Sequence, residues 1–220
     1  MNSILERVNL VCQNVRSMSK NPITFKKLIA STRKEFKDRD IDLSIKTKKD
    51  KNLSDGHFYV EAFYDAEDDF NGDTPIEVFM YHNFSDTNLF EKPQVTDILI
   101  QLFDAVTHEL KHQEQSRKRN YRVFSEHVTE PYSKYLADPD EVDAYAFSIA
   151  IELLRHMPKD RAELYMSKLT VLGKIKRANA LVSPILASYI GEFKNNPILV
   201  RLSKKVYKNL KVIDTSLIFK

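Results

Sequence analysis

The chain has 220 residues, of which 42% are hydrophobic and 30% charged, and its formal net charge is +3. This is the composition of an ordinary folded protein, and the length suits one domain or one domain with a small extension. The single cysteine, Cys12, excludes an internal disulfide and suits a reducing compartment. No apolar run approaches the roughly 20 residues that span a bilayer. Charged residues also interrupt the N-terminal apolar pattern, which excludes a secretory signal. We therefore expect a cytoplasmic protein with no membrane partner.

The first forty residues predict two helices, at 2–19 and 22–39. Pro22 suits the start of the second helix, because proline's missing N–H costs nothing in a first turn. Apolar residues recur behind it at helical spacing. The next segment, residues 46–56, is polar, charged and rich in turn formers, which predicts a loop.

The pattern then changes to that of strands. Residues 57–64 and 76–81 are rich in aromatic and β-branched side chains, so both predict strands. Between them lies an acidic segment that contains Asn71 and Gly72. The pair is therefore expected to form an antiparallel hairpin with a long acidic loop.

Helical periodicity returns after Pro93 and predicts a helix over residues 94–118. An irregular span, 120–139, follows it. Asp138 or Asp140 could cap the next helix, 141–156. Prolines then punctuate three further helices, at 159–179, 183–194 and 197–210. The fold class is α+β and mostly α, with a small antiparallel sheet ahead of the 94–118 helix. We expect a core of residues 1–156 and a helical C-terminal extension of residues 157–220.

One pentapeptide carries chemistry: residues 108–112 read HELKH, which matches the pattern HExxH. On a helix, residues four apart lie on one face, so His108 and His112 can direct both imidazoles at one ion. Neutral imidazole is a good zinc ligand. Glu109 follows the first histidine and can take a proton from a water held beside the metal. The sequence therefore predicts one zinc ion per chain, with Glu109 as general base.

A catalytic zinc needs three protein ligands and one open position. Glu141, 29 residues after His112, begins the next helix and is the favoured third ligand. Asp143 lies about 200° around that helix from Glu141, so the two cannot both face one ion. The remaining alternatives are Asp138, Asp140 and Asp143 on the same turn, and His127. A histidine ligand at position 118 is excluded, because that residue is Lys118.

The two segments together resemble a known group of proteins. HELKHQ followed by EVDAYAFSIAIELL resembles the gluzincins, in which HExxH is joined by a glutamate on a later helix. The similarity is greatest to ImmA/IrrE-type metallopeptidases and to small zincin-like proteins encoded by phages, and it covers residues 94–156. It implies a zincin-like fold, zinc ligands at His108, His112 and Glu141, and a general base at Glu109. Ala146 and Phe147 are in the reverse of the group's common order.

The predicted activity is peptide hydrolysis by a zinc-activated water from which Glu109 removes a proton. A hydrogen-bond donor for the developing oxyanion could be Tyr132, Tyr135, Tyr145 or His127. Asp104 lies one turn before His108. Its carboxylate could hydrogen-bond to a metal ligand and orient it without binding the metal itself. One of the two strands should form a sheet edge that binds a peptide substrate as an extra strand.

Charge is distributed unevenly along the chain. Residues 155–220 contain 14 Lys and Arg against 4 Asp and Glu, while the first 154 residues are net acidic. Most such helices simply present solvated lysines, but this third could also bind an acidic protein or a nucleic acid. The alternative to a peptidase is therefore an inactive zincin-like protein that binds a partner through its basic third. For a phage-encoded chain, the compartment would be the host cytoplasm.

Overall fold

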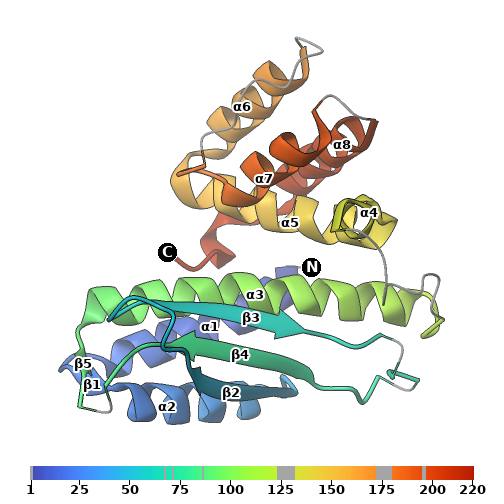
Figure 1. Cartoon of the computed structure of the whole chain (residues 1–220). Helices are drawn as coiled ribbons and strands as arrows, with labels where there is room; N and C mark the ends of the chain where they lie inside the picture. The colour runs from blue at the N-terminus through green and yellow to red at the C-terminus, as the bar shows by residue number, and fades with distance from the viewer. Residues whose placement is uncertain are drawn as a thin grey trace. The chain divides into compact units, whose positions relative to one another are not determined.

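The computed structural model describes residues 2–66, 68–70, 72–85, 87–122, 132–171, 180–194 and 197–220. They form two compact units (Figure 1). The N-terminal unit is Met1–Arg122 with Phe219–Lys220, and the C-terminal unit is Val123–Ile218. The chain thus divides after Arg122, ahead of the boundary that we expected after residue 156. The reason is that the 141–156 helix packs with the later helices rather than with the sheet.

Three helices form most of the N-terminal unit: α1 (Asn2–Met18), α2 (Phe25–Lys37) and α3 (Lys92–Lys118). Thr24, rather than Pro22, begins α2: the Thr24 side chain accepts a hydrogen bond from the Lys27 N–H and caps the helix. The helix α3 begins with a capping box formed by Glu91 and Gln94. Its 27 residues carry the HExxH segment in the second half, as the sequence predicted.

The sheet of this unit has three strands in the order β2-β4-β3. The predicted hairpin is confirmed, with β3 (Phe58–Phe63) antiparallel to β4 (Ile76–His82). The strand β2 (Leu43–Lys49) pairs parallel with β4, so the sheet is mixed rather than antiparallel. A second, two-stranded sheet joins β1 (Ile23–Thr24) to β5 (Leu89–Phe90).

The prediction of a loop over residues 46–56 was wrong for its first four residues, which belong to β2. This strand lies at a sheet edge and exposes Lys46 to Lys49, so only Ile45 is fully buried in it. Lysines on an edge strand are typical because they discourage pairing with another chain.

The helices cover one face of the three-stranded sheet (Figure 1). Along β4, buried and half-buried residues alternate, and the buried set lies on the helix side. The largest buried side chains include Phe36 of α2 and Phe103 of α3. Phe219 at the C-terminus completes this core, with its ring 6.4 Å from that of Phe103. The position of α3 is thus fixed by packing along its whole length.

The C-terminal unit is helical, with α4 (Tyr132–Ala137), α5 (Pro139–His156), α6 (Lys159–Val171), α7 (Pro184–Phe193), α8 (Pro197–Val212) and the 3-10 turn η1 (Thr215–Leu217). Asp138 caps α5 and Ser183 caps α7. The apolar side of α5 is fully buried, and this helix packs mainly on α8. The α+β, mostly α class is confirmed. Within the described residues, none of the helices combines the length and apolarity that crossing a bilayer requires.

Candidate functional site

The two histidines of the HExxH segment lie on one side of α3, one turn apart, and both are half-buried. Their Nε2 atoms are 3.1 Å apart, and the rings are steeply inclined, at 74°. Two nitrogen ligands at about 2.0–2.1 Å from a tetrahedral zinc lie roughly 3.3–3.4 Å apart. The spacing of His108 and His112 therefore fits a pair of ligands on one ion.

Glu109 lies beside this pair and is held by the backbone of a strand end. The Tyr64 N–H, just past the last residue of β3, donates a hydrogen bond of 3.0 Å to Glu109 Oε2. This contact joins the general-base candidate to the edge strand of the sheet, because β3 pairs with β4 alone among the described strands. Of the two strands proposed to border the site, β3 is thus the edge strand and β4 the central one.

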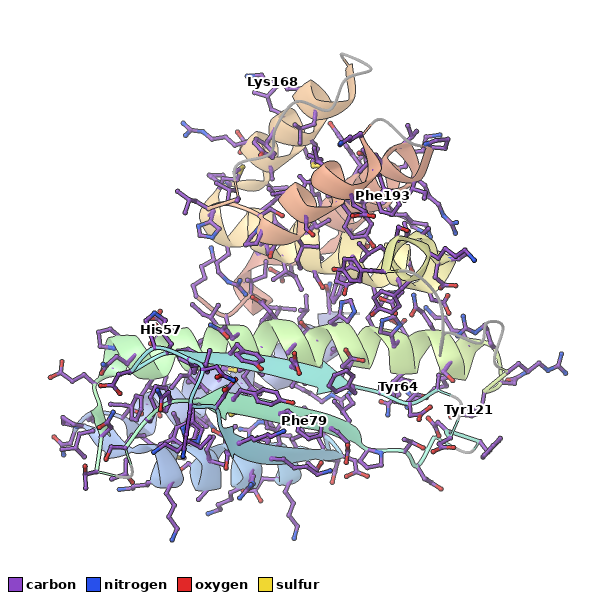
Figure 2. The ribbon with its side chains drawn as sticks, in the orientation of Figure 1. His57, Tyr64, Phe79, Tyr121, Lys168 and Phe193 are labelled. Atoms are coloured by element: carbon purple, nitrogen blue, oxygen red, sulfur yellow. The ribbon has the colours of Figure 1, made fainter. Side chains whose placement is uncertain are left out.

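Tyr64 is itself fixed by its side chain, at the place labelled in Figure 2. Its hydroxyl donates a hydrogen bond to Asp69, which is 1% exposed, and contacts Ser116 on α3. Burial raises the pKa of the Tyr64 hydroxyl, and the bond to Asp69 raises it further. A buried acid from the loop between β3 and β4 thereby locks the residue whose N–H binds Glu109.

The loop also depends on Gly72, whose φ is +84° and whose N–H bonds to Asp69 Oδ1. A Cβ added at Gly72 would lie 2.5 Å from the Tyr121 hydroxyl. The positive φ favours glycine here, and a Cβ would also displace the Tyr121 side chain. The long acidic loop that the sequence predicted is therefore shaped around Asp69.

Glu141 lies in the first turn of α5, in the C-terminal unit, and is only 8% exposed. A cluster of tyrosines surrounds it. The Tyr135 hydroxyl hydrogen-bonds to Glu141 and to Tyr145. Burial raises the pKa of Tyr135, and the charge of Glu141 raises it further, so Tyr135 stays neutral and donates. Hydrogen bonds of this kind orient a carboxylate that serves as a metal ligand.

The neighbouring acids have structural partners. The Asp138 carboxylate caps α5 by accepting the Asp140 N–H. Asp143 forms an ion pair of 2.9 Å with Lys205 of α8. These contacts leave Glu141 as the buried acid of this turn that is bound by a tyrosine. Asp104 is half-buried on α3, one turn before His108, as expected for its position.

The proposed oxyanion donors differ in their surroundings. Tyr132 is 62% exposed at the start of α4. Tyr145 packs its ring 5.5 Å from that of Tyr189, whose hydroxyl donates to the Leu136 carbonyl. Burial raises the pKa of Tyr189, and Tyr145 and Glu141 add to that rise. His127 lies outside the described residues.

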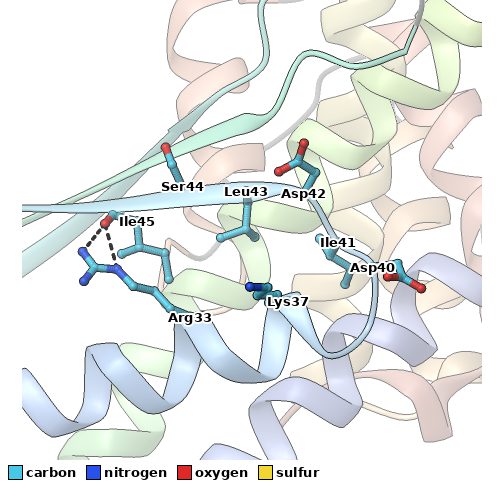
Figure 3. Close-up of a pocket in the computed structure, with 8 residues that line it drawn as sticks. All are labelled: Arg33, Lys37, Asp40, Ile41, Asp42, Leu43, Ser44 and Ile45. Atoms are coloured by element: carbon cyan, nitrogen blue, oxygen red, sulfur yellow. Dashed lines mark hydrogen bonds between the residues drawn. The ribbon is translucent and has the colours of Figure 1, made fainter.

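One hollow of about 720 Å³ lies elsewhere in the N-terminal unit, between the end of α2 and the start of β2 (Figure 3). Arg33 crosses it and donates from Nε to the Ile45 carbonyl at 3.2 Å. That bond covers an unpaired carbonyl on the outer edge of β2. None of the predicted site residues lines this hollow, and β2 is the sheet edge opposite to β3.

Sequence reasoning missed Tyr64, Asp69 and Tyr189. The first two have a local signal: a strand that ends in tyrosine leads into a loop rich in aspartate, and this loop connects the two strands that precede the HExxH helix. Tyr189 has none, because the contact between α7 and α5 depends on tertiary packing. No family model, no curated protein and no solved structure matches the chain, so the function must be argued from the site alone.

Proposed function

We propose that the chain is a zinc-dependent peptidase in which His108, His112 and Glu141 bind one metal ion. The observation that carries the proposal is the arrangement on α3. Two imidazole nitrogens lie at a spacing that suits one ion. The next residue in sequence, Glu109, is fixed by a backbone N–H at the end of an edge strand. A helix that presented solvated histidines would need none of these arrangements.

The donor set favours zinc among the common divalent ions. Two neutral imidazoles and one carboxylate are a ligand set that zinc accepts in catalytic sites, with a further position left for water. Calcium and magnesium prefer oxygen ligands instead. When bound, such an ion supplies Lewis-acid chemistry, which polarises a peptide carbonyl and makes a nearby water more acidic.

The residues of the chain then have distinct roles. Glu109 accepts a proton from the attacking water and returns it to the amine of the leaving peptide. The Tyr64 N–H keeps the Glu109 carboxylate on the strand side of α3. Tyr135 orients Glu141 through its hydroxyl, so its role is to position a ligand rather than to stabilise an oxyanion.

The edge strand β3 supports a peptide as the substrate class. A strand with a free edge can bind an extended peptide through backbone hydrogen bonds. The last residue of β3 is adjacent to the one that contacts Glu109, so a peptide paired with β3 would pass the general base. The acidic loop after β3 favours substrates with basic residues, because opposite charges attract.

The test is cleavage of a peptide mixture by the purified, zinc-loaded chain, followed by mass spectrometry. We expect cleavage by the wild type and loss of at least about a hundredfold in rate for Glu109→Gln. The matched control is Glu114→Gln, which changes a glutamate on the same helix that pairs with Lys111 and Lys118. Equal activity of wild type and Glu109→Gln would refute the proposal. Zinc binding without cleavage would instead favour the inactive, partner-binding alternative.

A further inference from the structure

The helix α8 carries one row of cations along its outer face. Arg201, Lys204, Lys208 and Lys211 are all exposed, at spacings of three, four and three residues. These spacings return to the same side of a helix on each turn, so the row runs straight for about 15 Å. Every exposed position between Arg201 and Lys211 is a cation.

The opposite side of α8 is buried against its own unit. Leu199, Leu202, Val206 and Leu210 are at most 1% exposed. The helix α8 packs mainly on α5 and also on α6. Its outer face is thus fixed in orientation by the core of the unit.

The row is not neutralised by the acids of the described residues. Lys205, beside the row, pairs with Asp143. No described carboxylate forms an ion pair with Arg201, Lys204 or Lys208, and α8 contains no acidic residue. The Lys211 ammonium lies 5.8 Å from the centre of the Tyr207 ring, and the Lys211 carbonyl accepts a hydrogen bond from Lys159. Like charges one turn apart repel, so this row carries an electrostatic cost that no described acid offsets.

A second basic helix, α2, lacks this arrangement although it carries as many cations. Its exposed lysines are interrupted by Ala30, and Arg33 is engaged by the Ile45 carbonyl. Asp38, Asp40 and Asp42 follow within about a turn of its end. The number of positive charges is therefore the same on α8 and α2. The two helices differ because only α8 has an uninterrupted row of exposed cations.

We propose that the outer face of α8 binds the phosphate backbone of a nucleic acid. A line of point charges that are one turn apart suits a line of phosphates, and three of the four residues are lysines, which make charge contacts without base specificity. An acidic protein would need an apolar centre in the interface. The exposed apolar residues of this helix, Val200 and Val212, flank the two ends of the row instead, and every exposed position between the ends is a cation. The surface lies in a different unit from His108 and Glu109, and the proposal does not depend on the peptidase activity.

The test measures binding of the full chain to a fluorescent 20-base-pair DNA and a single-stranded RNA at several salt concentrations. Four phosphate contacts predict a slope of log K against log salt of roughly −3.6 for duplex DNA and roughly −2.8 for single strands. For the duplex, this is a loss of about 150-fold in affinity between 50 and 200 mM salt. Changing all four row residues to Gln should abolish both the affinity and most of the slope.

The matched control changes Lys26, Lys27, Lys34 and Lys37 of α2 to Gln, which removes the same number of exposed positive charges from the chain. Because all eight side chains are exposed, we expect both variants to keep the circular dichroism spectrum of the wild type. The proposal holds if only the α8 variant loses binding. Equal losses in both variants, no binding at low salt, or tighter binding to polyglutamate or to anionic vesicles than to nucleic acid would each overturn it.

Discussion

The hydrogen bond from Tyr64 to Asp69 offers a quantitative test of how the acidic loop fixes Tyr64, whose N–H binds Glu109. Tyr64→Phe removes one hydroxyl and leaves its ring in place. Asp69 is 1% exposed, so water cannot replace the lost donor at its carboxylate. A buried charged acceptor that loses a hydrogen bond costs about 2 kcal/mol. For a chain of this size that corresponds to a fall in Tm of roughly 4–8 °C.

The assay is thermal and urea unfolding followed by circular dichroism, with Tyr59→Phe as the control. Tyr59 lies on the outer face of β3, stacked 4.6 Å from Tyr81, and its hydroxyl has no hydrogen-bond partner in the described part of the chain. Its loss should therefore change stability by less than about 0.5 kcal/mol. If Tyr64→Phe is no more destabilising than Tyr59→Phe, the loop does not clamp Tyr64 as described. Asp69→Asn combined with Tyr64→Phe should be clearly non-additive, since the two groups form one contact.

Three further predictions follow from single contacts. Tyr64, Tyr135 and Tyr189 should stay protonated when exposed tyrosines ionise near pH 10, because burial raises each pKa above the ordinary value of 10.0. Their contribution to stability is full below about pH 10 and is lost as pH rises, so absorbance at 295 nm should show a late phase that coincides with unfolding. Gly72→Ala should destabilise the chain by roughly 1–2 kcal/mol in a urea titration, since alanine resists a positive φ. Ser183→Ala should cost about 2 kcal/mol in the same titration, because the Ser183 hydroxyl both caps α7 and donates to the buried Glu152; no change would mean that neither bond matters.

The sequence predicted the longer helices and the hairpin well because periodicity reports burial directly. The short helix α4 (Tyr132–Ala137) was missed, since it lies within the span 120–139 that was predicted to be irregular. The helix α3 buries residues at three- and four-residue spacing, and β4 alternates strictly, so both patterns could be seen. The strand β2 could not, since its lysines hide the alternation and its pairing with β4 depends on residues about thirty positions away. The local sequence of an exposed edge strand lacks a clear alternation of apolar and polar residues, so its pairing with a distant strand is hard to predict.

The arrangement of the candidate site could be predicted only in part, for a similar reason. His108, Glu109 and His112 follow from the spacing of three residues on one helix. The contact between Tyr64 and Glu109 joins residues 45 positions apart. It depends on how far β3 runs before the acidic loop begins, which local patterns do not determine. The division into compact units after Arg122 lies ahead of the boundary expected after residue 156, because α5 packs with the later helices, and no local pattern reports that packing.

The central claim is that His108, His112 and Glu141 bind one metal ion. It is tested most directly by zinc content and affinity, measured by elemental analysis and by competition with a chromophoric chelator. We expect one zinc per chain in the wild type and in Glu109→Gln, because a base is not a ligand. His112→Ala and Glu141→Gln should each weaken binding by more than about a hundredfold, since losing a ligand costs more than losing a residue that orients one.

The controls are His156→Ala, an exposed histidine at the end of α5, and Asp143→Asn, the ion-pair partner of Lys205. Both should bind zinc as the wild type does. Full zinc binding by His112→Ala would contradict the account of the site. Loss with His112→Ala but not with Glu141→Gln would retain the pair on α3 and remove Glu141 as the third ligand.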